Sequence, residues 1–189
     1  MKLILTRHGE TEENKKGILQ GHLPGTLSKN GIEQGRKLSG RLKNEKIDVI
    51  FSSDLKRASD TAEIIAKHNP GIKIICTESL REGDGGDYTG KPTKELDWNN
   101  RPANAETVEQ IQKRAEEILD AAYEKYPDKT VLFVAHAGFN RILIAQIMGL
   151  KDPFKDLDDQ HNTAVNIFEI FEDKNHKVHC LNCIKHLKS

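Results

Sequence analysis

Six side chains that suit phosphate chemistry follow the short apolar runs of this sequence. In chain order they are Arg7, His8, Arg57, Arg81, Glu82 and His136. Arginine binds phosphate through two parallel hydrogen bonds and stays charged at neutral pH. A neutral imidazole can attack phosphorus, and a carboxyl group can protonate the oxygen that leaves. Because the transition state of phosphoryl transfer spreads negative charge over its oxygens, fixed cations stabilise it. These residue types therefore indicate phosphoryl transfer.

Four apolar runs of strand length must position these side chains. They are Leu3–Thr6, Ile47–Phe51, Ile72–Cys76 and Val131–Ala135. Their continuous apolar character is typical of parallel strands that are buried on both faces. Ligands bind at the carboxyl ends of such strands, so we expect the six side chains to meet at one edge of the sheet. The alternating run Ala164–Phe171 predicts a further strand, and Val178–Ile184 predicts an edge strand.

Helical patterns alternate with these runs. They cover residues 28 to about 45, 55–65, 108–122 and 142–148. Ser28 is the expected N-cap of the first, and Pro127 ends the third. The last pattern is apolar on nearly every side, which places that helix in the interior. The alternation predicts an α/β fold, a three-layer α/β/α sandwich with a mostly parallel central sheet.

One long segment fits neither the strand period nor the helix period. Gly83–Asn104 is rich in glycine and also contains Tyr88 and Trp98. A loop of this length in a compact domain is more often functional than idle. Since the chain has no internal repeat and no long linker, we expect a single domain over residues 1–189, with a lid segment at about 83–104.

Several motifs of this sequence resemble those of the histidine phosphatase superfamily, the phosphoglycerate mutase-like proteins. In the family's order they are LTRHGETEEN, QG at Gln20–Gly21, LSKNGIEQG, SSDLKRASDTAE, LRE followed by glycines, and VAHAG. The resemblance covers roughly residues 2 to 150. A single RHG triplet would be weak evidence, but the full ordered set is specific.

The resemblance implies a role for each matching position. His8 is the expected nucleophile that becomes phosphohistidine, and Glu82 is the expected proton donor. The expected phosphate-pocket and substrate-contacting residues are Arg7, Arg57, His136, Asn14, Gln20, Gly21 and the backbone N–H groups of Ala137 and Gly138. The resemblance also implies a phosphoglycerate mutase-like fold, no cofactor and no metal. Arg81 lies outside these positions and is expected to be structural.

The sequence departs from the family pattern directly after Glu82. Many relatives have an aromatic or aliphatic residue and a second acid there, whereas this chain reads GDGGDYTG. The additional glycines are expected to loosen the loop that carries Glu82. The departure leaves open whether Asp84 or Asp87 shares the acid role.

The favoured function is a metal-independent phosphomonoesterase that hydrolyses a small soluble phosphate ester through a phosphohistidine at His8. A phosphoglycerate mutase is the main alternative, and a non-catalytic phospho-ligand-binding protein is a third. Mutases usually carry a longer arginine-rich insertion after the acid, whereas the cations here are Lys91, Lys94 and Arg101. Because each expected catalytic position holds the expected residue type, a non-catalytic protein is disfavoured.

Charge and hydropathy restrict the partners. Lys plus Arg number 29 and Asp plus Glu number 29, so the formal net charge is zero. This balance argues against nucleic acid and anionic membranes, which usually select basic proteins. No apolar run approaches the ~20 residues that span a bilayer, and the early charges argue against a signal peptide. We expect a cytoplasmic protein that binds a small phosphorylated metabolite. The oligomeric state stays open, a homodimer included.

The three cysteines are too few for a disulfide framework. Cys76 lies in an apolar run and is expected to be a buried small hydrophobe. Cys180 and Cys183 have the spacing of metal ligands and lie near three histidines, yet strand alternation would turn them to opposite faces. A structural strand is therefore favoured over a metal site.

Overall fold

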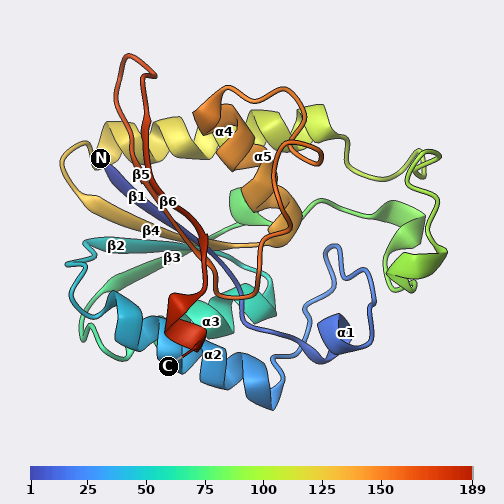
Figure 1. The fold of residues 1–189 in the computed structure, drawn as a ribbon, viewed down its shortest axis with the longest axis horizontal. Coiled ribbons are helices and arrows are strands. Elements are labelled where there is room, and N and C mark those ends of the chain that lie inside the picture. Colours follow the sequence, from blue (N-terminus) through green and yellow to red (C-terminus); the bar gives the residue numbers. More distant parts are fainter. Residues whose placement is uncertain (189) are drawn as a thin grey trace.

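A six-stranded sheet lies at the centre of the computed structural model, which describes residues 1–188. Ser189, the last residue of the predicted domain, lies outside the described residues. The strands are β1 (Lys2–Arg7), β2 (Val49–Ser53), β3 (Lys73–Thr77), β4 (Thr130–Ala135), β5 (Val165–Glu169) and β6 (Lys177–Cys183). Their order is β3-β2-β4-β1-β5-β6 (Figure 1). The first four in that order run parallel, and β5 and β6 are antiparallel to their neighbours. The prediction of a mostly parallel sheet is confirmed.

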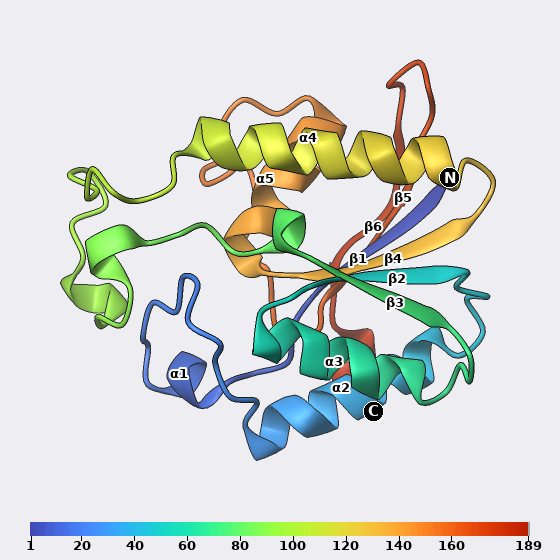
Figure 2. The same ribbon diagram turned by 180° about the vertical axis from the view of Figure 1, so that it is seen from behind.

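Helices cover both faces of this sheet. On one side lie α2 (Lys29–Leu42) and α3 (Lys56–Ala66), and on the other lie α4 (Val108–Lys125) and α5 (Ala137–Met148) (Figures 1 and 2). The short α1 (Glu12–Lys15) follows β1. The three-layer prediction is confirmed. Among the described helices, none is long and apolar enough to cross a membrane.

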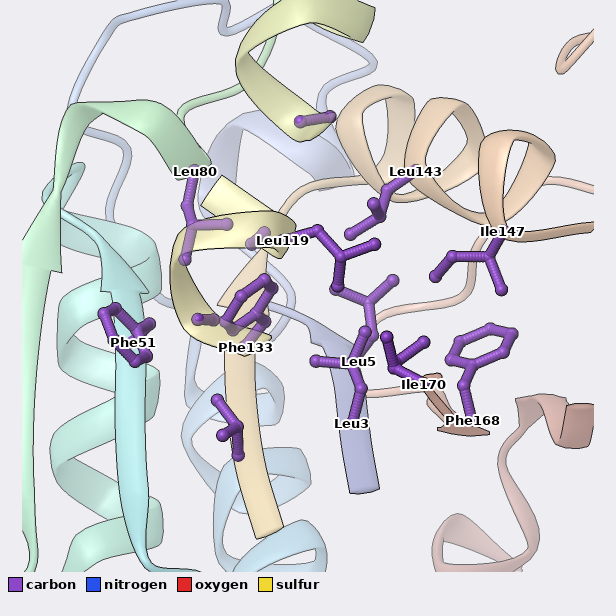
Figure 3. Packing of buried hydrophobic residues seen from close by; sticks show 14 of the residues in the cluster. Leu3, Leu5, Phe51, Leu80, Leu119, Phe133, Leu143, Ile147, Phe168 and Ile170 are labelled. Atoms are coloured by element: carbon purple, nitrogen blue, oxygen red, sulfur yellow. The ribbon is translucent and has the colours of Figure 1, made fainter. Parts of the chain in front are cut away.

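The continuous apolar runs are buried because alternate residues enter different layers. In β1, Leu3 and Leu5 pack with α4 and α5, whereas Ile4 packs with α2 and α3. Figure 3 shows Leu3 and Leu5 beside Phe133 in the first of these clusters. Each fully buried side chain of this size contributes about 1.5–3 kcal/mol. This packing fixes the strand ends that carry the site.

The predicted ends of the helices are largely reproduced. The Ser28 side chain accepts the N–H of Gly31 at 3.0 Å, so the N-cap is confirmed. The helix ends at Leu42 rather than near Glu45. The last helix is buried along most of its length, as predicted, and begins earlier, at Ala137.

Strand β3 is less buried than its sequence predicts. It forms one edge of the sheet and has no buried residue, and Cys76 is exposed. The prediction that Cys76 is buried is therefore wrong. β3 pairs with β2 along one side, and its other side is the outer edge of the sheet. Its apolar run therefore does not mean that its side chains are buried.

A bulge in β6 changes the placement of its cysteines. Val165 pairs with Cys183 and Ile167 pairs with Cys180, so two intervals along β5 face three along β6. Asn182 absorbs the additional residue with a φ of +46°. Since Val165 and Ile167 lie on the same face, Cys180 and Cys183 also share a face, and the prediction of opposite faces is wrong.

The segment 83–104 lies along the loop that follows α1. Its N–H and C=O groups pair with that loop: the Gly90 N–H donates to Leu19 O at 2.8 Å, and the Leu19 N–H donates to Lys91 O at 2.9 Å. An antiparallel bridge joins Ile18 to Pro92. Figure 2 shows the two segments side by side, beyond the end of the sheet. The long loop is therefore tied to the loop that contains Gln20 and Gly21.

Candidate active site

His8 is held in one tautomer at the end of β1. Its side chain is buried, and Nδ1 lies 2.7 Å from Gly9 O. A carbonyl only accepts, so Nδ1 carries the hydrogen. Nε2 then has the lone pair, which accepts the Arg57 Nε–H at 3.2 Å. Burial lowers the pKa of His8 well below 6.5, and Arg57 and Arg7 lower it further. His8 is therefore a neutral imidazole with Nε2 as its nucleophilic atom.

Close backbone contact positions the loop after His8. A Cβ added to Gly31 would lie 1.9 Å from Glu10 O, and one added to Gly9 would lie 2.5 Å from Gly31 O. Only glycine allows the start of α2 to approach this loop so closely. This close approach explains why the first glycine of the LSKNGIEQG motif, Gly31, must be a glycine.

Arg57 is buried and is oriented by the Gln20–Gly25 loop. Nη2 donates to Gly21 O at 2.9 Å, and Nη1 donates to Leu23 O. Burial lowers the pKa of Arg57 to about 10, although the charge of Glu82 raises it. Arg57 therefore stays cationic at neutral pH. Gly21 was expected to contact phosphate or substrate. In the structure its carbonyl accepts a hydrogen bond from Arg57.

Arg7 and His136 present polar atoms that other residues leave unpaired. Arg7 Nη1 donates to Gln160 O at 2.7 Å, but Arg7 Nε is buried without a partner in residues 1–188. Both ring nitrogens of His136 are likewise unpaired among the described residues. The His136 ring lies 5.1 Å from the His8 ring, centroid to centroid. Buried polar atoms are nearly always satisfied, so these atoms indicate a polar ligand such as phosphate.

Burial also controls the charge of His136. It lowers the pKa of His136 well below 6.5, and Arg57 and His8 lower it further. Burial lowers the pKa of Arg7 as well, while the charge of Glu82 opposes this effect. The pocket therefore contains two guanidinium cations and two neutral imidazoles at neutral pH.

Glu82 is fixed at the N-terminus of α5. Its carboxylate accepts the N–H groups of Gly138 at 3.1 Å and Phe139 at 3.0 Å, and also that of Gly83 at 3.0 Å. The expected loosening of Glu82 by the glycine-rich loop is therefore not observed. The Gly138 N–H, expected to contact phosphate, donates to Glu82 instead. A helix N-terminus favours such a negative group.

Arg114 and His22 hold the main chain around Glu82. Arg114 donates to Arg81 O at 2.7 Å and to Glu82 O at 3.3 Å, and it pairs with Glu106 through Nε at 2.7 Å. His22 Nε2 lies 2.9 Å from Glu82 O and must donate to it. Sequence reasoning missed both residues. The sequence does offer one indication for Arg114, which is its position next to the apolar stripe of α4.

Asn162 and Gln160 were also missed. Asn162 Nδ2 donates to His8 O at 3.0 Å and to Asn14 Oδ1 at 3.4 Å. Asn14 Oδ1 also accepts the Thr11 N–H at 3.2 Å, so Asn14, which was expected to contact substrate or phosphate, completes the capping box of α1, whose N-cap is Thr11. Both missed residues directly precede β5, which is antiparallel to β1. Its start therefore lies at the same edge of the sheet as His8.

The remaining predicted positions have simpler placements. Gln20 is buried, and its Oε1 is unpaired within residues 1–188. Asp84 accepts the Gly86 N–H at 2.9 Å, and exposed Asp87 accepts Asn104 Nδ2 at 2.9 Å. Asp84 thus stabilises a local turn, and Asp87 joins two distant parts of the long loop. Ala137 begins α5, next to His136.

The described residues contain no group of three or more His, Cys, Asp or Glu that could hold a metal ion. Arg57 and Arg7 supply positive charge near His8 that can stabilise a bound phosphate.

Comparison with known proteins identifies the family and the fold of this chain. The family model of the histidine phosphatase superfamily (branch 1) matches residues 3–183. An "Uncharacterized phosphatase PhoE" from Bacillus subtilis is 34% identical over 91% of this chain and 90% of that protein. A "Metal-independent phosphoserine phosphatase" from Arabidopsis thaliana is 30% identical over 92% of this chain and 78% of that protein. The solved structure of Bacillus stearothermophilus YhfR matches with a TM-score of 0.91 and 28% identity, over 98% of each chain. The sequence-based family prediction is confirmed: this chain belongs to branch 1 of the histidine phosphatase superfamily.

Proposed function

We propose that this protein hydrolyses phosphomonoesters of small molecules in two steps, through a phosphohistidine at His8 and without a metal ion. The observation that carries the proposal is the tautomer of His8. Its Nδ1–H is engaged by Gly9 O, so the Nε2 lone pair faces the cationic pocket. The phosphatase names of the relatives support the reaction class.

In the first step, His8 Nε2 attacks phosphorus and the bond from phosphorus to the ester oxygen breaks. Arg7, Arg57 and His136 bind the other phosphate oxygens and stabilise their charge. Glu82, in its protonated form, gives its proton to the departing oxygen. The products of this step are the free alcohol, a carboxylate at Glu82 and a phosphoramidate at His8.

In the second step, water attacks phosphorus and the N–P bond breaks. Glu82 accepts a proton from the water, which restores the acid for the next cycle. Inorganic phosphate leaves, and His8 returns to its neutral form with the hydrogen still on Nδ1. The hydrogen bond to Gly9 O keeps that nitrogen from competing as a nucleophile.

A mutase reaction would require the pocket to retain a second phosphorylated molecule and exclude water. The long loop offers three cations, Lys91, Lys94 and Arg101, and all three are exposed. A loop whose cations face solvent favours hydrolysis over transfer to a bound product.

Trapping the phosphoenzyme tests the proposal. After rapid acid-free quenching, we expect an alkali-stable, acid-labile phosphoryl group on the wild type and on His179→Ala, an exposed-histidine control. His8→Ala should carry none and should lose turnover. Turnover that depends on added magnesium after EDTA treatment would overturn the metal-free mechanism. Interconversion of phosphoglycerates faster than hydrolysis would favour the mutase.

A further inference from the structure

Cys180 and Cys183 occupy an arrangement that a regular strand does not allow. In a regular strand, residues three apart lie about 10 Å from each other and point to opposite faces. A disulfide needs Cα atoms about 4.4–6.8 Å apart. In β6 the bulge at Asn182 places both cysteines opposite Val165 and Ile167, which are two residues apart on β5, a span of about 6.6 Å. Both obstacles to a bond are thus removed.

The side chains of the two cysteines also meet. The side chain of Cys183 neighbours that of Cys180, whose Sγ–H donates to Val165 O at 3.6 Å, and both residues are partly exposed on this edge strand. Burial raises the pKa of Cys180, and the neighbouring Cys183 raises it further. A raised pKa lowers the thiolate fraction of Cys180, which makes it a poor first attacker.

The bulge residue between them is tied to the loop that holds the phosphate pocket. Asn182 Nδ2 donates to Asp159 O at 2.9 Å, and Asn182 Oδ1 accepts the His161 N–H at 3.0 Å. Between these two lies Gln160, whose carbonyl accepts the Arg7 guanidinium. Asn162, which follows His161 in the chain, donates to His8 O. The hydrogen bonds of Asn182, Gln160 and Asn162, together with the peptide bonds of residues 159–162 and 180–183, thus connect the thiol pair to Arg7 and His8.

We propose that Cys180 and Cys183 form a reversible disulfide and that closing this bond displaces residues 159–162, which position Arg7 and His8. Its effect on turnover rests on the proposed phosphatase function. The formation of the bond and the displacement of the loop do not.

The oxidant is a low-molecular-weight disulfide. The Cys183 thiolate attacks one of its sulfur atoms, which forms a mixed disulfide and releases one thiol. The Cys180 thiolate then attacks the Cys183 sulfur and releases the second thiol. Two protein thiols are oxidised to one disulfide, and one small disulfide is reduced to two thiols. The attack needs a thiolate, so the rate should rise with pH.

Closing the bond must move the bulge. Two non-bonded sulfur atoms approach until they are about 2.05 Å apart. A shift of about 1 Å at a catalytic group is enough to cost up to about a hundredfold in rate. Because Arg7 is only one of the pocket's cations, we expect about a tenfold lower kcat in the oxidised protein.

The first measurement uses Cys76→Ser, which leaves the pair as the chain's only thiols. After incubation with glutathione disulfide, the intact mass should fall by two hydrogen atoms, both thiols should become unreactive, and dithiothreitol should reverse both changes. Cys76→Ser/Cys180→Ser should instead retain one glutathione. Failure to form the internal disulfide under conditions that modify this control would overturn the proposal.

The second measurement follows the loop by hydrogen exchange of peptides spanning residues 157–165, in which His161 donates to Asn182 and Thr163 donates to Arg7 O. Oxidation should change exchange there and lower kcat. Asn182→Gly keeps the positive φ but removes both side-chain links, so its disulfide should form with much smaller effects. If the loop's exchange is unchanged by oxidation, the coupling is refuted whatever the activity. If exchange changes and no phosphate ester is hydrolysed, the proposed function fails and this inference stands.

Discussion

Replacing Arg114 with lysine should impair the delivery of a proton by Glu82. Arg114 makes hydrogen bonds to the carbonyls of Ser79, Arg81 and Glu82, and it binds both carboxylate oxygens of Glu106. Its guanidinium also lies 5.1 Å from the centroid of the Phe139 ring. The Phe139 N–H in turn donates to the Glu82 carboxylate. Arg114 therefore positions the acid through its main chain and through α5.

The size of the effect follows from these contacts. Hydrogen bonds to charged groups contribute about 1.5–3 kcal/mol each. Lysine keeps the charge but offers a single nitrogen, so it can replace about two of the contacts. Since the Arg114 and Glu106 side chains are each 17% exposed, water replaces part of the rest. We expect Arg114→Lys to lower the free energy of unfolding by about 2–4 kcal/mol. If Glu82 moves by about 1 Å, its proton transfer should slow by about tenfold to a hundredfold.

The assay compares two leaving groups. An aryl phosphate releases a stable phenolate and needs little protonation, whereas an alkyl phosphate releases a poor leaving group and needs the acid. Arg114→Lys should therefore lower kcat for the alkyl ester about tenfold more than for the aryl ester, with KM for both nearly unchanged. A general loss of structure would lower both rates by the same factor.

Arg141 provides a matched control. It too donates to carbonyls of a loop, those of Pro153, Phe154 and Leu157, and pairs with a carboxylate, that of Asp159. Its side chain is similarly buried, at 12% exposure, but it has no contact with Glu82 among its hydrogen bonds. Because Asp159 is 90% exposed, Arg141→Lys should lose somewhat less stability, and it should keep the ratio of the two rates. Equal ratios in the two variants would refute the positioning role of Arg114.

Three further outcomes follow from the same geometry. Since the pKa values of His8 and His136 are well below 6.5 in the folded protein, the unfolded chain binds more protons as the pH falls. Stability should therefore fall below about pH 6.5 by up to about 1.4 kcal/mol per pH unit for each of these two histidines, and urea unfolding of His136→Asn should show a slope smaller by up to this amount. Gly31→Ala places a Cβ 1.9 Å from a carbonyl oxygen and should cost about 3 kcal/mol or more, whereas Gly40→Ala, in open space on the same helix, should be neutral or stabilising in thermal unfolding. Glu82→Gln should lower kcat for alkyl phosphates by about 10²–10⁴ and affect aryl phosphates less; equal losses would contradict its role as an acid.

The central part of the site could be predicted because it depends on strand ends. Arg7 ends β1, and His8 and His136 directly follow β1 and β4, so the topology of the sheet alone brings them to one edge. The apolar runs of these strands are long enough to be recognised in the sequence. Alternate residues along each run are buried on the two opposite faces of the sheet. Arg57 could be predicted for the same reason, because it lies at the start of α3, one turn beyond the end of β2.

The supporting contacts could not be predicted because they join distant parts of the chain. Arg114 meets Glu82 only once α4 packs against the segment after β3, and no local pattern encodes that contact. Asn162 approaches His8 because β5 reverses direction beside β1. The bulge at Asn182 breaks the period of two on which the prediction for Cys180 relied, since a non-glycine residue with positive φ has no clear sequence signal.

The choice of hydrogen-bond acceptors explains how a chain of zero net charge can present a cationic pocket. Several structural arginines are paired with carboxylates, which cancel their charge: Arg81 with Asp54, Arg114 with Glu106 and Arg141 with Asp159. The pocket arginines are oriented by main-chain carbonyls instead, Arg57 by Gly21 and Leu23 and Arg7 by Gln160. A carbonyl fixes a guanidinium without neutralising it, so the positive charge is left for the phosphate. The nearby carboxylate of Glu82 is occupied by N–H groups of the α5 N-terminus rather than by these arginines. In the proposed mechanism, this separation of partners leaves one acid and two cations available to act on the same phosphate ester.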